Sequence, residues 1–534
     1  MSRPSSLSVP FWIILIAITA AFVLAFSTPA GIGLTNDSAA YIGGARSILA
    51  GTGYSDVWLD SSLEALTHYP PLFSISLAGL GLFGLDPLRG ARLLNILLFG
   101  ANTALMGWLG WRMTKLQAAG IFLALLFGLN ASILRVHAYA LSEPLFLFFS
   151  LSAFIFFDFS VEQRTSASKP VSNGWMLLVG SLASLAFLTR YSGLALIATF
   201  FLAIIILNST WRARLTKSAW FLAGCLPLSA AWFIRNRLVA GNATNRTFQF
   251  HPILWDNVKI GLYNVAGFLL PVHSCQPALF KSGALTWILP LLALALLSWL
   301  GFRAYQLLSH PSETLPPSLA FTTAVYVFGY LGAVLFSMSF FDASTKFQPR
   351  ILAPLYVSGM ILFAAALSRI IGIARSADGN LRIKSLTALA VGFAALSLGL
   401  SIWSFLPAVS DLRSAAGLGY GSWQWRDSMV MESLKKLPSD VAIYTNSTPA
   451  VYLVTGRASR IIPTVIDPVD NLPRGDYAQN LAAMRADLLS RRAVLALFDT
   501  SDIEDALGAE NFAEFIAGLT VLEKAQGDIL YGIP

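Results

Sequence analysis

Ionisable side chains that could do acid–base chemistry gather in the stretch from Thr35 to Pro71, directly after the first long apolar segment. They are Asp37, Asp56, Asp60, Glu64 and His68. A carboxylate near a membrane surface is a candidate general base, because partial burial raises the pKa of its acid form. Asp37 also opens a segment with helical spacing, where a carboxylate caps a helix. The residue alone therefore leaves two interpretations, a general base and a helix cap.

Glu143 is the second acidic candidate. It lies in the sequence Ala-Leu-Ser-Glu-Pro between two apolar segments, at the expected start of a helix. The first turn of a helix favours a carboxylate, which gives Glu143 a structural explanation. The functional alternative is a second acid that works with Asp37, either by orienting an acceptor or by holding a metal ion.

A divalent metal ion is an open alternative for the acidic and imidazole groups. The candidate ligands are Glu143, His68 and His251. These are residue types that bind divalent ions, but no two of them are closely spaced as in a dedicated metal motif. The spacing therefore establishes no cofactor, and a divalent metal ion stays an open alternative.

Basic residues at the ends of apolar segments form a third group. They are Arg190, Arg235, Lys346 and Arg350. Short loops rich in Lys and Arg lie on the cytoplasmic side, and this rule puts these four residues at extracytoplasmic ends of the expected helices, where it does not explain them. An anionic lipid phosphate gives them a function. The structural alternative is that their side chains extend to the headgroups of the outer leaflet.

The composition defines the class of protein. The chain has 534 residues, of which 56% are hydrophobic and 12% are charged. A soluble domain has about twice this charged fraction. Long apolar runs recur, so we expect a polytopic α-helical membrane protein. The sequence has no phosphate-binding loop for ATP, and its two cysteines indicate no disulfide framework.

The apolar segments predict about 11 transmembrane helices. The first segment could also be a cleaved signal peptide, but the many later spans favour a retained helix. Leu72–Leu85 is either a short span or an interfacial helix, and the charge distribution favours the interfacial helix. The predicted spans are Val9–Phe26, Ala91–Met113, Ala118–Leu134, Pro144–Phe157, Gly174–Leu188, Gly193–Leu207, Ala219–Ile234, Leu285–Tyr305, Leu319–Phe340, Ile351–Ile373 and Leu386–Leu406.

The sequence changes character after Pro407. Residues 408–534 carry a net charge of −5, whereas residues 1–407 carry +13. Helical and strand-like segments alternate in this region, which predicts a small soluble α/β domain. We therefore expect a transmembrane catalytic domain over residues 1–407 and an extracytoplasmic α/β domain over residues 408–534. The second domain would cover the cavity or select the acceptor.

Several short motifs occur in an order and spacing that resemble a known family. They are Asn36-Asp37-Ser38 with Tyr41, Gly51-Thr52-Gly53-Tyr54, Tyr69-Pro70-Pro71-Leu72, Arg92, Ser142-Glu143-Pro144, Thr189-Arg190-Tyr191, Arg235-Asn236, and Arg350 with Pro354. The chain resembles the GT-C glycosyltransferases, and within them glycosyltransferase family 39. That family comprises polyprenyl-phosphate-sugar-dependent mannosyltransferases and aminoarabinose transferase relatives.

The resemblance implies an inverting transfer of a sugar from a polyprenyl-phosphate donor to an acceptor hydroxyl, on the extracytoplasmic side of what would be a bacterial plasma membrane. It makes Asp37 the catalytic base and Glu143 the acid of the second external loop. The four basic residues would bind the donor phosphate. The aromatic residues Tyr41, Tyr69 and Tyr191 of these motifs, together with the neighbouring His68, would line the substrate cavity.

This sequence also departs from the family. His68-Tyr69 stand where some relatives have an acidic residue and a lysine, and Ser38 follows Asp37 where protein mannosyltransferases often have a glutamate. The acceptor, whether glycan, lipid or protein, and the sugar, whether hexose or pentose, therefore stay open. Membrane lipids are expected partners and nucleic acids are not. The alternative function is a lipid or glycolipid flippase without glycosyl transfer.

Overall fold

The structure is a computed structural model that describes residues 8–60, 64–162, 173–244, 248–272, 275–309, 318–376, 381–415, 417–466, 473–500, 503 and 509–533. Its contacts divide the chain into two compact units. Unit 1 comprises Met1–Ser27, Leu94–Ala138 and Ser142–Asp411. Unit 2 comprises Thr28–Leu93, Tyr139–Leu141 and Leu412–Pro534. Each unit is described separately below.

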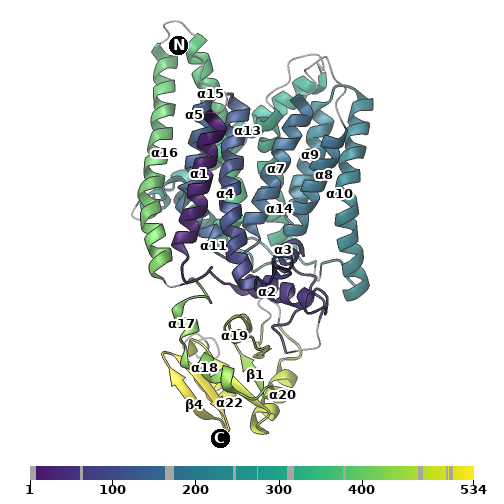
Figure 1. The fold of residues 1–534 in the computed structure, drawn as a ribbon, viewed down its shortest axis with the longest axis vertical. Helices are drawn as coiled ribbons and strands as arrows, with labels where there is room; N and C mark the ends of the chain where they lie inside the picture. Colours follow the sequence, from purple (N-terminus) through teal and green to yellow (C-terminus); the bar gives the residue numbers. More distant parts are fainter. Residues whose placement is uncertain are drawn as a thin grey trace. The chain divides into compact units, whose positions relative to one another are not determined.

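Unit 1 is a bundle of helices. Its helices are α1 (Ser8–Ser27), α4 (Pro87–Thr114), α5 (Gln117–Gly128), α6 (Ala131–His137), α7 (Glu143–Glu162), α8 (Gly174–Thr189), α9 (Gly193–Leu207), α10 (Trp211–Ala240), α11 (Trp255–Leu269), α12 (Gln276–Lys281), α13 (Ala284–Ser309), α14 (Ser318–Phe340), α15 (Pro349–Ser376) and α16 (Leu381–Ser414). Helix α8 packs between α7 and α10, and α14 packs on α9 and α15 (Figure 1).

The predicted class is confirmed, because the described part of the chain has eight helices long and apolar enough to cross a membrane. A ninth span results if the bent pair α5 and α6 is counted as one. Helices α8 and α9 occupy two further predicted segments, but they are only 16 and 15 residues long. A span normally needs about 20 residues. Every predicted apolar segment is thus helical, while these two are short.

The segment predicted as one helix, Ala118–Leu134, is broken. Helices α5 and α6 meet at an angle of 61°. Between them, the side chain of Asn130 accepts a hydrogen bond from the backbone N–H of Ile133 at 3.0 Å. An asparagine in extended backbone favours the start of a new helix over continuation of the old one. Hydropathy does not register this, because the apolar run passes through the break.

Unit 2 contains two short helices of the first loop, α2 (Asn36–Leu49) and α3 (Leu72–Gly81), which pack on one another. Helix α2 is the segment of helical spacing that Asp37 opens in the sequence. Helix α3 ends at Gly81, so the predicted segment Leu72–Leu85 contains only 10 helical residues. This length is about half of what a span requires.

The rest of unit 2 holds a five-stranded sheet in the order β2-β1-β3-β5-β4. The strands are β1 (Ala442–Thr445), β2 (Arg460–Ile461), β3 (Ala493–Leu497), β4 (Thr520–Ala525) and β5 (Asp528–Gly532). Strands β2, β1 and β3 are parallel, and β5 joins β3 and β4 in antiparallel pairs. The predicted α/β character of this region is therefore confirmed.

Helices cover both faces of this sheet, and Figure 1 labels them around strands β1 and β4. The helices are α17 (Trp423–Arg426), α18 (Met429–Lys436), α19 (Thr448–Thr455), α20 (Tyr477–Leu489) and α22 (Ala509–Ile516). Strand β3 is buried on both sides: Leu495 packs with α20 and α22, and Val494 packs with α18 and α19. Helices α17 and α18 are separate, because Ser428 caps the start of the second.

In the first loop, residues 54–56 pair with residues 64–66. Asp56 donates its backbone N–H to Glu64 O at 3.0 Å, and its carboxylate accepts the Glu64 N–H at 3.3 Å. The side chain is only 9% exposed. Burial raises the pKa of Asp56 from the ordinary value of 3.8 to about 6, against the lowering effect of the Glu64 hydrogen bond.

We predict that Asp56→Asn stabilises the protein at about pH 8 and has little effect at about pH 4. A carboxyl group whose folded pKa is raised lowers stability as pH rises from its unfolded to its folded pKa. The amide avoids this cost, which is at most about 3 kcal/mol, and keeps the acceptor oxygen. Melting temperatures of both proteins at the two pH values test this, with the exposed Asp440→Asn as control. A gain in melting temperature that is the same at both pH values would contradict the raised pKa of Asp56.

Candidate active site

Asp37 lies in the first turn of α2, and the neighbouring residues close the helix start. Ser38 Oγ accepts the backbone N–H of Thr35 at 2.9 Å, and the Ser38 N–H bonds to Thr35 O at 3.0 Å. The Asp37 carboxylate accepts a hydrogen bond from the hydroxyl of Tyr69 at 3.2 Å. A capping box formed by Thr35 and Ser38 thus holds the turn that presents Asp37.

An aromatic cluster surrounds this hydrogen bond. The ring of Tyr69 lies 5.4 Å from that of Tyr41 and 4.9 Å from that of His68, both edge to face. Tyr41 is buried and packs edge-on against Phe73 of α3 at 5.1 Å. Three of the four predicted cavity residues therefore lie together. Tyr41 supports Tyr69, and Tyr69 contacts Asp37.

Glu143 is the first residue of α7 and is 1% exposed. Its Oε1 lies 2.7 Å from Nη1 of Arg190 and 3.9 Å from Nη1 of Arg350. Arg190 follows the last residue of α8, and Arg350 lies in the first turn of α15. The hydroxyl of Ser142 accepts a hydrogen bond from Arg190 at 3.3 Å. Three helix ends thus bring together three residues that the sequence separates widely.

Two guanidinium groups meet one buried carboxylate in this cluster. Neither oxygen of Glu143 has a partner in good hydrogen-bond geometry among the described residues, so the contacts with the arginines are ionic. Arginine is the residue type that binds carboxylates and phosphates through paired N–H donors. The cluster therefore consists of residue types that suit an anionic ligand.

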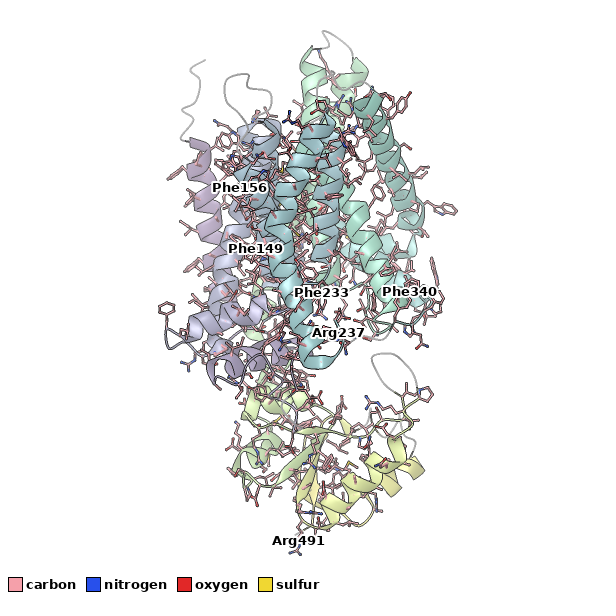
Figure 2. The ribbon with its side chains drawn as sticks, turned by 90° about the vertical axis from the view of Figure 1, so that its right-hand side faces the viewer. Phe149, Phe156, Phe233, Arg237, Phe340 and Arg491 are labelled. Carbon is pink, nitrogen blue, oxygen red and sulfur yellow. The ribbon has the colours of Figure 1, made fainter. Side chains whose placement is uncertain are left out.

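Tyr191 and Arg235 lie in a second cluster, centred on Trp232 of α10. The indole N–H of Trp232 donates to the Tyr191 hydroxyl at 3.1 Å. The guanidinium of Arg235 lies 5.2 Å from the centre of the indole ring and donates to Asn236 Oδ1 at 3.1 Å. Figure 2 labels Phe233 and Arg237 at the same end of α10. Tyr191 directly follows Arg190 and so connects the two clusters through the chain.

Lys346 and His251 lie in two other segments. Lys346 is exposed in the loop before α15, and its carbonyl accepts the N–H of Gln348 at 2.7 Å. Gln348 in turn accepts a hydrogen bond from Nε of Arg350 at 3.2 Å. His251 lies in an extended segment, and its backbone N–H donates to Ser339 O at 2.7 Å.

Two asparagines that the sequence analysis did not single out hold the loop before Arg350. Asn257 donates to Thr345 O at 3.1 Å, and Asn264 donates to Phe347 O at 2.7 Å. Both lie on α11, in a region expected only as a long external loop. Their spacing of seven residues places them on one face of a helix, which is the signal that could have identified them.

The described residues contain no group of three or more His, Cys, Asp or Glu side chains that could hold a metal ion. The candidate ligands Glu143, His68 and His251 are therefore not part of such a group. The observed partners of Glu143 are arginines, which suit an anion rather than a cation.

The chain has the fold of the GT-C glycosyltransferases, as two solved structures show. One is ArnT from Cupriavidus metallidurans bound to undecaprenyl phosphate, with 15% identity, coverage of 97% of both chains and a TM-score of 0.55. The other is the archaeal oligosaccharyltransferase AglB from Archaeoglobus fulgidus in complex with an inhibitory peptide and a dolichol-phosphate. It has 14% identity, coverage of 98% of this chain and 74% of that chain, and a TM-score of 0.54.

The sequence is also similar to one family within this class. Residues 52–235 match the family described as dolichyl-phosphate-mannose-protein mannosyltransferase. No curated protein matches the chain. The resemblance found in the short motifs is therefore confirmed, and the chain is related to glycosyltransferases that are integral membrane proteins.

We predict that Glu143→Gln destabilises the protein more than Asp86→Asn. The first change leaves two guanidinium groups beside a neutral amide in a buried place, where loss of one partner costs roughly 3–5 kcal/mol. The second breaks a pair of Arg46 and Asp86 whose side chains are 30% and 46% exposed, where the expected cost is below about 1 kcal/mol. Melting temperatures measure the difference. An equal fall in melting temperature in both variants would show that Glu143 does not stabilise the two arginines.

Proposed function

We propose that the chain is an inverting glycosyltransferase that moves a sugar from a polyprenyl-phosphate donor to an acceptor hydroxyl. The observation that carries the proposal is the cluster in which Arg190 and Arg350 meet the Glu143 carboxylate at the ends of apolar helices. Two guanidinium groups in this position suit the phosphate of a lipid-linked donor. The fold shared with an undecaprenyl-phosphate-bound transferase supports the same donor class.

In this proposal Arg190 and Arg350 bind the donor phosphate, with Arg235 and Lys346 as further cations. Guanidinium groups bind phosphate oxygens through paired hydrogen bonds. A phosphate departs as a stable anion, so its departure needs positive charge and donors rather than a strong acid. Glu143 is then a positioning residue, because its carboxylate fixes the two guanidinium groups.

Asp37 is the proposed catalytic base. Its carboxylate takes the proton of the acceptor hydroxyl while that oxygen attacks the anomeric carbon. The new bond joins this carbon to the acceptor oxygen, and the bond to the phosphate oxygen breaks with its electrons leaving on the lipid phosphate. Attack opposite the leaving group inverts the anomeric configuration, as in inverting hydrolysis. Tyr69 holds the carboxylate in place.

The proposal places Asp37, the arginines and the α/β domain on the extracytoplasmic side of a bacterial plasma membrane. The cytoplasmic preference of Lys-rich and Arg-rich short loops supports this orientation. The acceptor is a glycan, a lipid or a protein, and the sugar is a hexose or a pentose. The aromatic cluster of Tyr41, His68 and Tyr69 provides ring faces on which a sugar could pack.

A lipid or glycolipid flippase is the second candidate. The break between α5 and α6 favours it, because interrupted helices within a membrane bundle are frequent in transporters. The two candidates differ in chemistry. A transferase releases free polyprenyl phosphate, whereas a flippase moves its lipid unchanged.

We predict that Asp37→Asn lowers kcat by about 10²-fold to 10⁴-fold, because the amide cannot take the acceptor proton. The variant keeps the shape of the side chain and an oxygen for the Tyr69 hydroxyl. The assay incubates purified protein with a panel of polyprenyl-phosphate sugars and acceptors and measures released lipid phosphate.

The exposed Asp256→Asn is the control for the loss of one carboxylate, and its turnover should match that of the parent protein. Nuclear magnetic resonance of the product reports the anomeric configuration. Near-normal turnover of Asp37→Asn, or retention of configuration, would refute the assigned base. Lipid transport without release of lipid phosphate by the parent protein would favour the flippase.

A further inference from the structure

The segment Gly417–Ser422, named the latch here, pairs with the residues that lead into α2. The backbone N–H of Leu34 donates to Leu418 O at 3.0 Å, and the N–H of Tyr420 donates back to Leu34 O at 3.0 Å. Leu34 and Gly419 thus form a parallel bridge. The latch belongs to the polar C-terminal region, whereas Leu34 stands three residues before Asp37 in the sequence.

The fit of the latch requires glycine at position 419. Gly419 has a φ of +54°, and a Cβ atom there would lie 2.1 Å from the carbonyl oxygen of Leu34. Such a contact is far inside van der Waals distance, and the backbone conformation itself disfavours L side chains. The close approach of the two backbones is therefore specific to this residue.

A side-chain contact extends the latch to the first residue of α2. The hydroxyl of Tyr420 donates to Oδ1 of Asn36, which directly precedes Asp37. The ring of Tyr420 is fixed in turn by Trp425, edge to face at 5.0 Å. A rigid aromatic side chain thus connects the C-terminal region to the turn that carries the proposed base.

The same turn is held on another side by the second loop. Gly33 forms a parallel bridge with Tyr139, and the N–H of Ala140 donates to Gly33 O at 2.8 Å. The buried hydroxyl of Ser38 donates to Ala140 O at 3.0 Å. Residues 33–38 therefore lie between two segments that are distant in sequence.

Two more contacts connect the C-terminal region to the first loop. The N–H of Asp60 donates to Ser459 O at 3.0 Å, and the Asp60 carboxylate pairs with Arg460 at 2.9 Å. Helix α19 packs on α2, where the Tyr452 ring lies 5.6 Å from the guanidinium of Arg46. The latch is the one among these three contacts that reaches the residue next to Asp37.

We propose that the latch orients Asp37, with Tyr420 as a positioning residue, so that the C-terminal domain sets the rate of transfer. The proposal rests on the proposed function in taking Asp37 as the base. The rate of a proton transfer depends on placing the base within hydrogen-bond distance of the acceptor, and small misplacements are costly. Contacts at Leu34 and Asn36 fix the turn without contacting the reacting atoms.

The test uses two variants of the full-length protein, Tyr420→Phe and Gly419→Ala. The first removes one hydroxyl and keeps the ring. We expect a fall in kcat of about fivefold to tenfold, with KM for the polyprenyl-phosphate donor unchanged within about twofold. The second separates the two backbones and should reduce kcat further.

Matched controls come from the same domain. Tyr477→Phe removes a hydroxyl at the start of α20, and Gly475→Ala adds a Cβ that meets no atom within 4 Å. Both controls should keep the kcat of the parent protein. Melting temperatures separate an effect on the rate from general loss of folded protein.

Hydrogen exchange of the backbone amides of residues 33–45 provides a readout that needs no activity. We expect faster exchange in Tyr420→Phe and Gly419→Ala and not in the controls. If the parent protein has no transferase activity but the two variants still exchange faster, the proposed function is refuted, while the structural role of the latch stands. Three outcomes in the variants would refute the proposed role of the latch. They are unchanged exchange, a kcat within twofold of the parent protein, and a rise in KM for the donor without a fall in kcat.

Discussion

The contact of the buried Glu143 carboxylate with Arg190 and Arg350 is the interaction on which the site depends. Burying a lone carboxylate is too costly to persist, and burying two guanidinium groups without an anion is equally unfavourable. The three groups therefore fix the ends of α7, α8 and α15 relative to one another. Guanidinium groups also bind phosphates, which is the role proposed for these two arginines.

The sequence predicted the fold class because long apolar segments by themselves identify membrane helices. Each apolar segment forms a helix, and the alternating segments after Pro407 form a sheet with helices. It could not predict the break at Asn130, where a single side-chain acceptor outweighs a continuous apolar run. It also overestimated the length of the helix after Pro71, because hydropathy does not register where the backbone turns.

The sequence predicted candidate site residues one at a time, but it did not predict how they group. Asp37, Glu143 and the arginines were proposed from their type and their position at helix ends, and their roles stay predictions. That Glu143 would meet arginines rather than another acid depends on the packing of helices distant in sequence, which no local pattern encodes. The supporting asparagines of α11 had a readable spacing of seven residues, but only for a segment already known to be helical.

Unit 2 is assembled from the first loop, three residues of the second loop and the end of the chain. Its contacts therefore join residues made early in synthesis to residues made much later. Chains generally fold from the amino terminus as they emerge, and contacts of long sequence separation form late. The helices that cross the membrane are complete before the latch exists. A chain interrupted during translation would thus insert into the membrane with Leu34 and Asn36 still lacking their partners from the C-terminal region.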